Sequence, residues 1–146
     1  MTNFVLDASV ALKWIIPSEA ETLIEDALRL LRRYTSGEIG FVVPDIFWAE
    51  VGNVIWKGVR QQRWSQSFAE RAVSDLRERE FFTVSSHRLL PEALIIALAH
   101  NRTVYDSLYV ALAIQSKTQM ITADERLANA LAASLPVKWL GAFGIE

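Results

Sequence analysis

The chain has 146 residues, of which 51% are hydrophobic and 22% charged, and its net charge at pH 7 is −2. So apolar a composition excludes a disordered chain, and the balanced charge excludes a strongly basic nucleic-acid-binding tail. The absence of cysteine excludes disulfides, thiolate metal sites and a cysteine nucleophile. Because this length suits one folded unit, we expect a single domain over residues 1–146.

Membrane insertion is not expected. The longest uninterrupted apolar run, residues 93–99, is far shorter than the roughly 18 residues that a membrane-spanning helix needs. The chain starts without a basic cluster, and Asp7 stands where a signal peptide would be apolar. We therefore expect a cytoplasmic protein without a membrane anchor.

Short apolar runs alternate along the chain with longer stretches of helical periodicity. Strands are expected at residues 4–6, 41–43, 81–84, 120–121 and 137–139, the last as an edge strand. Helices are expected at residues 9–16, 21–34, 46–62, 68–79, 91–100, 104–116 and 125–133. Apolar strands separated by amphipathic helices are typical of a parallel sheet covered on both faces, so the pattern predicts an α/β fold.

Four helix starts have the spacing of a capping box, in which an acid follows a hydroxyl residue after three positions. The pairs are Ser18 with Glu21, Ser67 with Glu70, Thr103 with Asp106, and Thr122 with Glu125. They support the helix assignments. They also offer a purely structural role for some of the acids and hydroxyls considered next.

Two acids follow predicted strands closely. Asp7 comes directly after the strand at residues 4–6, and Asp124 comes shortly after the strand at residues 120–121. In an open parallel sheet, ligands bind beyond the carboxyl ends of the strands, so both carboxylates are candidates for a binding site. Each acid could instead cap the helix that follows it.

Two further acids stand on apolar helices. Glu50 shares a helix face with Phe47, Val51 and Val54, where an unpaired carboxylate would cost several kcal/mol to bury. It therefore needs a cation, a partner or a raised pKa; a buried ion pair with an arginine, or a helix face rotated outward, is the structural alternative. Asp106 begins a helix apolar enough to be central, which would bring its carboxylate to the same sheet edge, although a capping box also explains it.

Four carboxylates at one end of a sheet repel one another and raise one another's pKa. A divalent cation removes this conflict, and a donor set made only of oxygens favours Mg²⁺ or Mn²⁺ over zinc. Such an ion leaves room for phosphate oxygens and can polarise a phosphodiester. The sequence therefore predicts a catalytic metal site made of Asp7, Glu50, Asp106 and Asp124.

Four segments together resemble the PIN-domain nucleases, and most closely the toxins of VapBC toxin–antitoxin modules. They are FVLDAS at residues 4–9, PDIFWAEVGN at 44–53, YDSLYVALA at 105–113 and TADERL at 122–127. The resemblance implies a three-layer α/β/α sandwich around a short, mostly parallel sheet. It also implies a Mg²⁺- or Mn²⁺-dependent endoribonuclease, frequent homodimers, and neutralisation by an antitoxin.

The same resemblance assigns roles to individual residues. The family's acidic quartet falls on Asp7, Glu50, Asp106 and Asp124. Asp7 and Asp106 are the expected direct metal ligands. Glu50 and Asp124 are expected either to bind the metal or to hold water molecules bound to it. Ser9 and Thr122 match small polar positions beside the site, where we expect them to hydrogen-bond the ligands; helix capping is their alternative role.

Basic and aromatic residues are candidates for contacting RNA. Lys57, Arg60 and Arg63 follow Glu50 along one helix and its exit, and Lys13 lies close to Asp7 in the sequence. These cations could guide RNA phosphates toward the site. A solvated basic face is the simpler explanation. Trp14, Trp48, Trp56, Trp64 and Trp139 are expected mainly in the core, with RNA stacking, a dimer seam or an antitoxin groove as alternatives.

Other functions have weaker support. An aspartyl-phosphate enzyme would need a second acid where Ser9 stands. A metal-free ribonuclease would use His87 and His100 as an acid–base pair, but neither follows a predicted strand, and both are expected at the surface or at a helix end. The main alternative to a nuclease is a PIN-fold interaction module with little or no catalysis.

Overall fold

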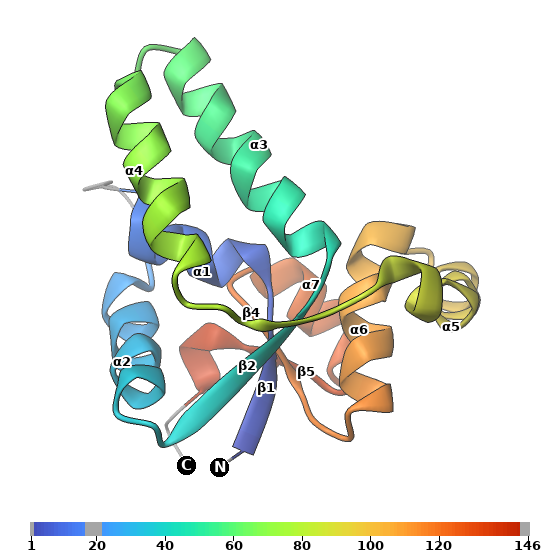
Figure 1. The fold of residues 1–146 in the computed structure, drawn as a ribbon. Helices are drawn as coiled ribbons and strands as arrows, with labels where there is room; N and C mark the ends of the chain where they lie inside the picture. Colours follow the sequence, from blue (N-terminus) through green and yellow to red (C-terminus); the bar gives the residue numbers. More distant parts are fainter. Residues whose placement is uncertain (1, 17–21, 144–146) are drawn as a thin grey trace.

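The computed structural model describes residues 2–16 and 22–143. Within them, five parallel strands form one sheet in the order β3-β2-β1-β4-β5 (Figure 1). The strands are β1 (Thr2–Leu6), β2 (Ile39–Pro44), β3 (Phe82–Val84), β4 (Met120–Thr122) and β5 (Val137–Trp139). The predicted strands are confirmed, and the sheet is parallel throughout.

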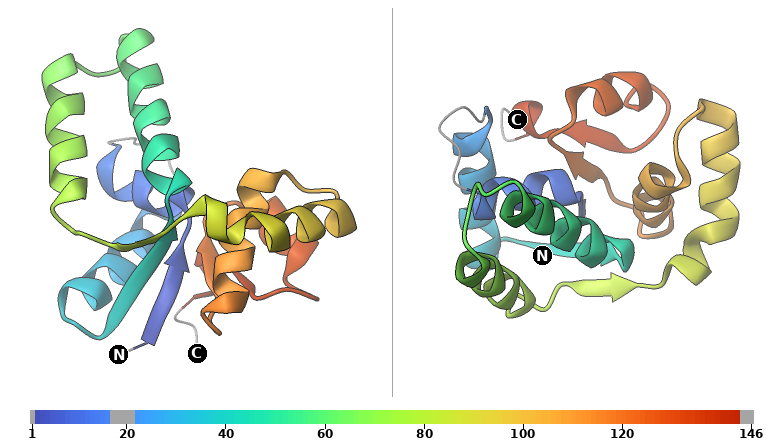
Figure 2. Two further views of the ribbon diagram at one scale, coloured as in Figure 1. Left: turned by 45° about the vertical axis from the view of Figure 1, so that its right-hand side comes forward. Right: turned by 90° about the horizontal axis from the view of Figure 1, so that it is seen from above.

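Helices cover both faces of this sheet, which confirms the predicted three-layer α/β/α architecture (Figure 2). They are α1 (Ala8–Ile15), α2 (Ile24–Thr35), α3 (Ile46–Arg60), α4 (Gln66–Arg77), α5 (Ser86–His100), α6 (Val104–Gln115), α7 (Glu125–Leu131) and the short 3₁₀ turn η1 (Leu140–Ala142). Helices α1 and α2 lie on one face, whereas α6 packs against β1, β2 and β4 on the other, with α5 outside it. In the described part of the chain, no helix is long and apolar enough to cross a membrane.

An aromatic cluster joins the sheet to the base of α3. The rings of Phe41 and Phe81 meet edge to face with centroids 5.8 Å apart, and Tyr34 stacks on Phe41 at 5.2 Å. Phe47 and Trp48, in the first turn of α3, contact Phe81 at 5.9 and 6.0 Å. Each such pair contributes roughly 0.5–1.5 kcal/mol beyond its buried area, so the cluster fixes where α3 leaves the sheet.

The strand order creates a switch point between β1 and β4. From β1 the chain moves outward through β2 to β3, and it then returns to place β4 on the other side of β1. Ligands bind parallel sheets at such a point, outside the carboxyl ends of the strands. The backbone N–H of Asp7 donates to the carbonyl of Ile121 at 3.1 Å, which ties the ends of β1 and β4 together there.

Helix α3 and helix α4 form a hairpin that rises from the same carboxyl edge (Figure 1). Only the base of α3 therefore lies near the switch point. Glu50 belongs to this base, in the second turn of the helix.

The structure corrects two predicted capping boxes and confirms one hydroxyl cap. Thr103 caps α6 as predicted, since its hydroxyl accepts a hydrogen bond from the N–H of Asp106. Helix α4 begins two residues earlier than expected because Ser65, not Ser67, accepts the N–H of Phe68. The pair at Ser18 and Glu21 lies outside the described residues.

Helix α7 is capped by an acid and not by the predicted hydroxyl. Asp124 is the cap of this helix, because its Oδ1 accepts the N–H of Leu127 at 3.1 Å. Thr122 ends β4 and does not cap the helix, so the predicted box of Thr122 with Glu125 is wrong. The hydroxyl of Thr122 is engaged by Asp7 and by the backbone of Asp124.

Helix α5 begins at Ser86, five residues before the predicted start at Pro91. Ser85 caps it by accepting the N–H of His87 at 3.1 Å. Pro91 lies in the second turn, where its ring removes one helical hydrogen bond without ending the helix. Proline favours the first helical position, which is why the sequence pattern points to Pro91, but the earlier serine cap decides the start.

The two serines before α4 offer a direct test of the capping assignment. Ser65→Ala should lower the free energy of unfolding by about 1 kcal/mol, because one N–H at the start of α4 loses its acceptor. Ser67→Ala should cost clearly less, since Ser67 lies inside the helix. Urea unfolding of both variants measures this, and an equal or larger loss for Ser67→Ala would contradict the assignment.

Candidate active site

Asp7 lies at the junction of β1 and α1, at the switch point of the sheet. It occupies the N-cap position of α1, but its side chain makes no capping hydrogen bond. Its Oδ2 atom accepts hydrogen bonds from the hydroxyls of Ser9, at 2.6 Å, and Thr122, at 2.8 Å. The carboxylate is therefore held between the first turn of α1 and the end of β4.

The two hydroxyls are themselves oriented by the backbone. Ser9 Oγ accepts the N–H of Ala123 at 3.0 Å, and Thr122 Oγ1 accepts the N–H of Asp124 at 3.0 Å. Because each oxygen receives a backbone proton, each hydroxyl proton is directed to Asp7. The structure thus brings Ser9 and Thr122 to the carboxylate, where we expected them, and their functional role stays a prediction.

Glu50 is held by a partner that the sequence pattern does not reveal. The hydroxyl of Tyr109 on α6 donates to Glu50 Oε1 at 2.5 Å, and the Tyr109 side chain is only 1% exposed. Tyr109 lies three residues after Asp106, so both occupy one face of α6. A phenol on so apolar a helix needs a polar partner when it is buried, and this spacing is the signal that could have found it.

Asp106 and Asp124 complete the group at the starts of two helices. Asp106 lies in the first turn of α6, and Asp124 caps α7 through Oδ1. The alternative role weighed for Asp124, a helix cap, is thus real, and it occupies one carboxylate oxygen. The N-termini of both helices favour negative charge at these positions.

The pKa values of Asp7 and Glu50 are shifted by burial and by the charges of neighbouring acids. The pKa of Asp7 is raised to about 6: burial raises it most, the Ser9 and Thr122 hydrogen bonds lower it, and the charges of Glu50 and Asp106 add to the rise. Burial also raises the pKa of Glu50, which the Tyr109 hydrogen bond opposes and the charge of Asp106 reinforces. These carboxylates are therefore protonated more readily than ordinary surface acids.

Asp106 links the fourth acid to the others. Burial raises its pKa most, the nearby charge of Arg102 lowers it, and the charge of Asp124 raises it. Arg102 lies between α5 and α6 and is a cation near the acids that the sequence pattern does not single out. The four predicted acids thus form one charge-coupled group, which we call the acidic edge: Asp7, Glu50, Asp106 and Asp124.

The acidic edge has the chemistry of a site for a hard cation. Its donors are all oxygens, and three of the carboxylates have pKa values raised by burial that a cation would lower. Among the described residues, no three acidic or histidine side chains stand close enough together to form a finished metal site. The donor set fits Mg²⁺ or Mn²⁺.

Two of the predicted RNA-contacting residues lie at the far end of α3. Lys57 and Arg60 are in the last turn of α3, which leads away from the sheet edge (Figure 1), and the Arg60 guanidinium lies 5.5 Å from the Trp56 ring centroid. Lys13 is in the last turn of α1. RNA contact by Lys13, Lys57 and Arg60 stays a prediction.

The two histidines stand at opposite ends of one helix. His87 is in the first turn of α5 and His100 is its last residue. At 1.5 Å per residue this separates them by about 20 Å, too far for an acid–base pair acting on one phosphate. The surface or helix-end location expected for both is confirmed.

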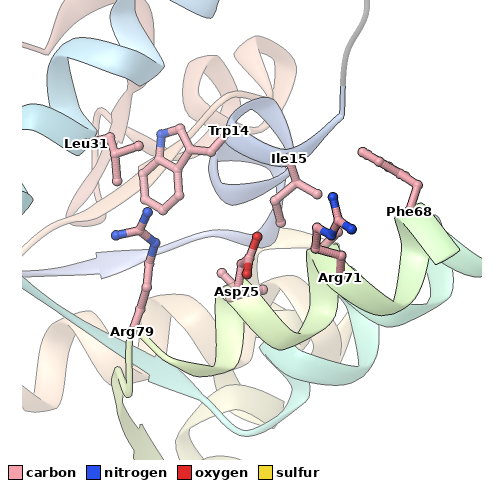
Figure 3. Close-up of a pocket in the computed structure, with 9 residues that line it drawn as sticks. Trp14, Ile15, Leu31, Phe68, Arg71, Asp75 and Arg79 are labelled. Atoms are coloured by element: carbon pink, nitrogen blue, oxygen red, sulfur yellow. The ribbon is translucent and has the colours of Figure 1, made fainter.

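One hollow lies beside the α3–α4 hairpin, and another lies between its two helices. The first, of about 220 Å³, lies between α1, α2 and α4 and is lined by Trp14, Leu31 and Phe68, while Arg71 of α4 and Arg79, just beyond the end of α4, stand beside it (Figure 3). The other, of about 500 Å³, is an apolar groove between α3 and α4. Trp56 borders this groove and is 54% exposed, so the expectation of a core position is wrong for it.

The fold and the acidic edge define a class: three-layer α/β proteins with an all-carboxylate site at the switch point of a parallel sheet. Residues 4–131 match the sequence model of the PIN domain family, and the chain therefore belongs to this family. It is 30% identical over 131 residues to Ribonuclease VapC3 of Pyrobaculum aerophilum, and the alignment covers 87% of this chain and 93% of that protein.

Two solved structures have a similar fold. The crystal structure of PAE2754 from Pyrobaculum aerophilum aligns with a TM-score of 0.69 and 20% identity, covering 96% of this chain and 85% of that one. The second is the crystal structure of VapBC2 from Rickettsia felis bound to a DNA fragment from the promoter of these proteins. One of its chains aligns with a TM-score of 0.63 and 10% identity, covering 94% of this chain and 98% of that one. At these identities the likeness concerns the fold.

Asp7 should destabilise the metal-free protein at neutral pH. Because its pKa is raised from 3.8 to about 6 by folding, the folded state binds the proton more tightly, and stability falls as the pH rises through this range. Asp7→Asn keeps an acceptor for Ser9 and Thr122 but cannot ionise. With a chelator at pH 7.5, it should raise the free energy of unfolding by on the order of 2 kcal/mol, and the gain should shrink toward pH 4.

Urea unfolding of wild type and Asp7→Asn at both pH values measures this difference. A variant that is less stable than wild type at pH 7.5, or a gain that is the same at pH 4, would contradict the assigned cause. Asp75→Asn, on α4, serves as the control for the loss of one negative charge.

Proposed function

We propose that this protein is a divalent-metal-dependent endoribonuclease, the toxin of a VapBC-type toxin–antitoxin module, and that the acidic edge hydrolyses RNA phosphodiesters. The observation that carries the proposal is the gathering of four acids from four separate segments at the switch point of a PIN-family sheet. The relative of 30% identity, named a ribonuclease, supports the activity over nearly the whole chain.

The proposal gives each part of the acidic edge a role. Asp7 and Asp106 would hold the Mg²⁺ or Mn²⁺ ion directly, with Glu50 and Asp124 as further ligands or as acceptors for water. The ion, when bound, polarises the phosphodiester and makes water a better nucleophile. Ser9 and Thr122 would hold the Asp7 carboxylate through their two short hydrogen bonds, both to Oδ2.

Neutralisation by an antitoxin follows from the same charges. An arginine or lysine of the antitoxin, inserted among the four carboxylates, would satisfy them and exclude the metal. The hollow between α1, α2 and α4 is suited to the apolar part of such a partner, since Trp14, Leu31 and Phe68 line it. Its charged rim, with Arg71, Asp75 and Arg79, can pair with polar side chains of the partner next to the apolar one.

We also propose that the protein forms a homodimer. The outer face of α5 exposes Leu94, Ile95 and Leu98 at 47%, 68% and 76%. Apolar side chains clustered in this way are typical of surfaces that a protein partner covers. The homodimer proposal rests on the family and on this patch.

Cleavage of a mixed RNA pool tests the proposed activity. Purified, antitoxin-free protein should cut RNA with Mg²⁺ or Mn²⁺ and should not do so with a chelator. Asp7→Asn and Asp106→Asn should each lower the rate by at least about 100-fold, because each removes a ligand charge from the metal site. Glu78→Gln, an exposed acid at the end of α4, should cleave like wild type.

The outcomes separate the nuclease from its alternative. Undiminished cleavage by both aspartate variants would refute the assigned site. A folded protein that cleaves no RNA with either metal, yet binds an antitoxin-like partner, would favour a PIN-fold interaction module with little or no catalysis.

A further inference from the structure

Tyr109 is a buried polar group that none of the roles above accounts for. Its side chain is 1% exposed, at the centre of the apolar helix α6. Its hydroxyl donates to Oε1 of Glu50 on α3 at 2.5 Å. One hydroxyl therefore connects α6, whose first turn carries Asp106, with the second turn of α3, which carries Glu50.

Packing alone does not call for this hydroxyl. Phenylalanine would fill almost the same volume, and it would avoid placing a hydroxyl between a helix and a carboxylate in a desolvated setting. The hydroxyl has a role in orienting Glu50, because a short hydrogen bond to a half-buried carboxylate favours one rotamer of that side chain. Among the described residues no hydrogen bond reaches Glu50 Oε2, so that oxygen is available to a ligand.

The spacing on α6 places this contact at the acidic edge. Asp106 and Tyr109 lie one turn apart on the same face of the helix. Helix α6 thus supplies one acid directly and orients a second acid that belongs to α3.

We infer that Tyr109 is a positioning residue, whose hydroxyl holds the Glu50 carboxylate so that one oxygen faces a cation at the acidic edge. The role of that oxygen rests on the proposed function, whereas the Tyr109–Glu50 contact does not. Partners of this kind typically change metal affinity or activity by 10–100-fold when they are removed.

The test compares two tyrosine-to-phenylalanine variants. Tyr109→Phe removes the hydroxyl that contacts Glu50. Tyr34→Phe, the matched control, removes a hydroxyl that donates to the carbonyl of Arg79 at 3.0 Å on the α2 side of the sheet. Both variants keep the ring, so any loss of packing is small and similar, and urea unfolding shows whether each is folded.

Mn²⁺ binding by the protein alone is the first measurement. Tyr109→Phe should weaken Mn²⁺ binding by about 10-fold or more, and Tyr34→Phe should leave it within about two-fold of wild type. In RNA cleavage at saturating Mn²⁺, Tyr109→Phe should lower kcat with little change in KM, because the hydroxyl does not reach the substrate. Unchanged Mn²⁺ binding by a folded Tyr109→Phe protein would overturn the inference.

A double variant shows whether the effect runs through Glu50. If it does, Tyr109→Phe should weaken Mn²⁺ binding in the wild-type background but add little to Glu50→Gln. An equal effect in both backgrounds would show that Tyr109 acts by another route and would also overturn the inference.

The two proposals fail in different ways. A wild-type protein that binds Mn²⁺ but cleaves no RNA would sink the proposed nuclease, and the Tyr109 inference would still be decided by the binding comparison. A wild-type protein that binds no Mn²⁺ would remove the cation that Glu50 is inferred to face, and the inference would be wrong.

Discussion

The acidic edge depends on how the protein holds carboxylates that burial and mutual repulsion both oppose. Asp7 meets this constraint most directly, since burial raises its pKa to about 6 while two hydroxyls stabilise its charge. Those hydroxyls come from α1 and β4, and the backbone N–H groups of Ala123 and Asp124 aim them. These hydrogen bonds lower the free energy of the charged carboxylate, but its pKa stays raised. A bound cation would stabilise the charged form further.

Topology supplies the meeting point for this chemistry. Strands β1 and β4 are adjacent although they lie far apart in the sequence, so Asp7 and Thr122 meet only because the chain reverses its direction across the sheet. The aromatic cluster anchors the base of α3 and so brings Glu50 to the same edge, where a hydroxyl from α6 receives it. The site therefore forms only when the whole fold forms, because each acid is placed by a different helix or strand.

Features that depend on local pattern could be predicted from the sequence, and features that depend on distant contacts could not. Apolar runs locate all five strands, and the apolar helix face around Glu50 is enough to mark its carboxylate as unusual. The predicted start of α4 is wrong because Ser65 and Ser67 have similar local signals, and only geometry decides between them. Tyr109 lies within one of the four PIN-like segments, but its role depends on a partner 59 positions away on another helix.

The pKa of Asp7 is the most direct measure of the central claim, and ¹³C NMR of its side-chain carboxyl carbon in metal-free protein reports it. We predict a pKa near 6 without metal, as burial dictates, and a marked fall when Mg²⁺ is added, because the cation favours the charged carboxylate. A pKa near the ordinary value of 3.8 that does not respond to Mg²⁺ would contradict this claim, since the carboxylate would then be neither desolvated nor within reach of a bound ion.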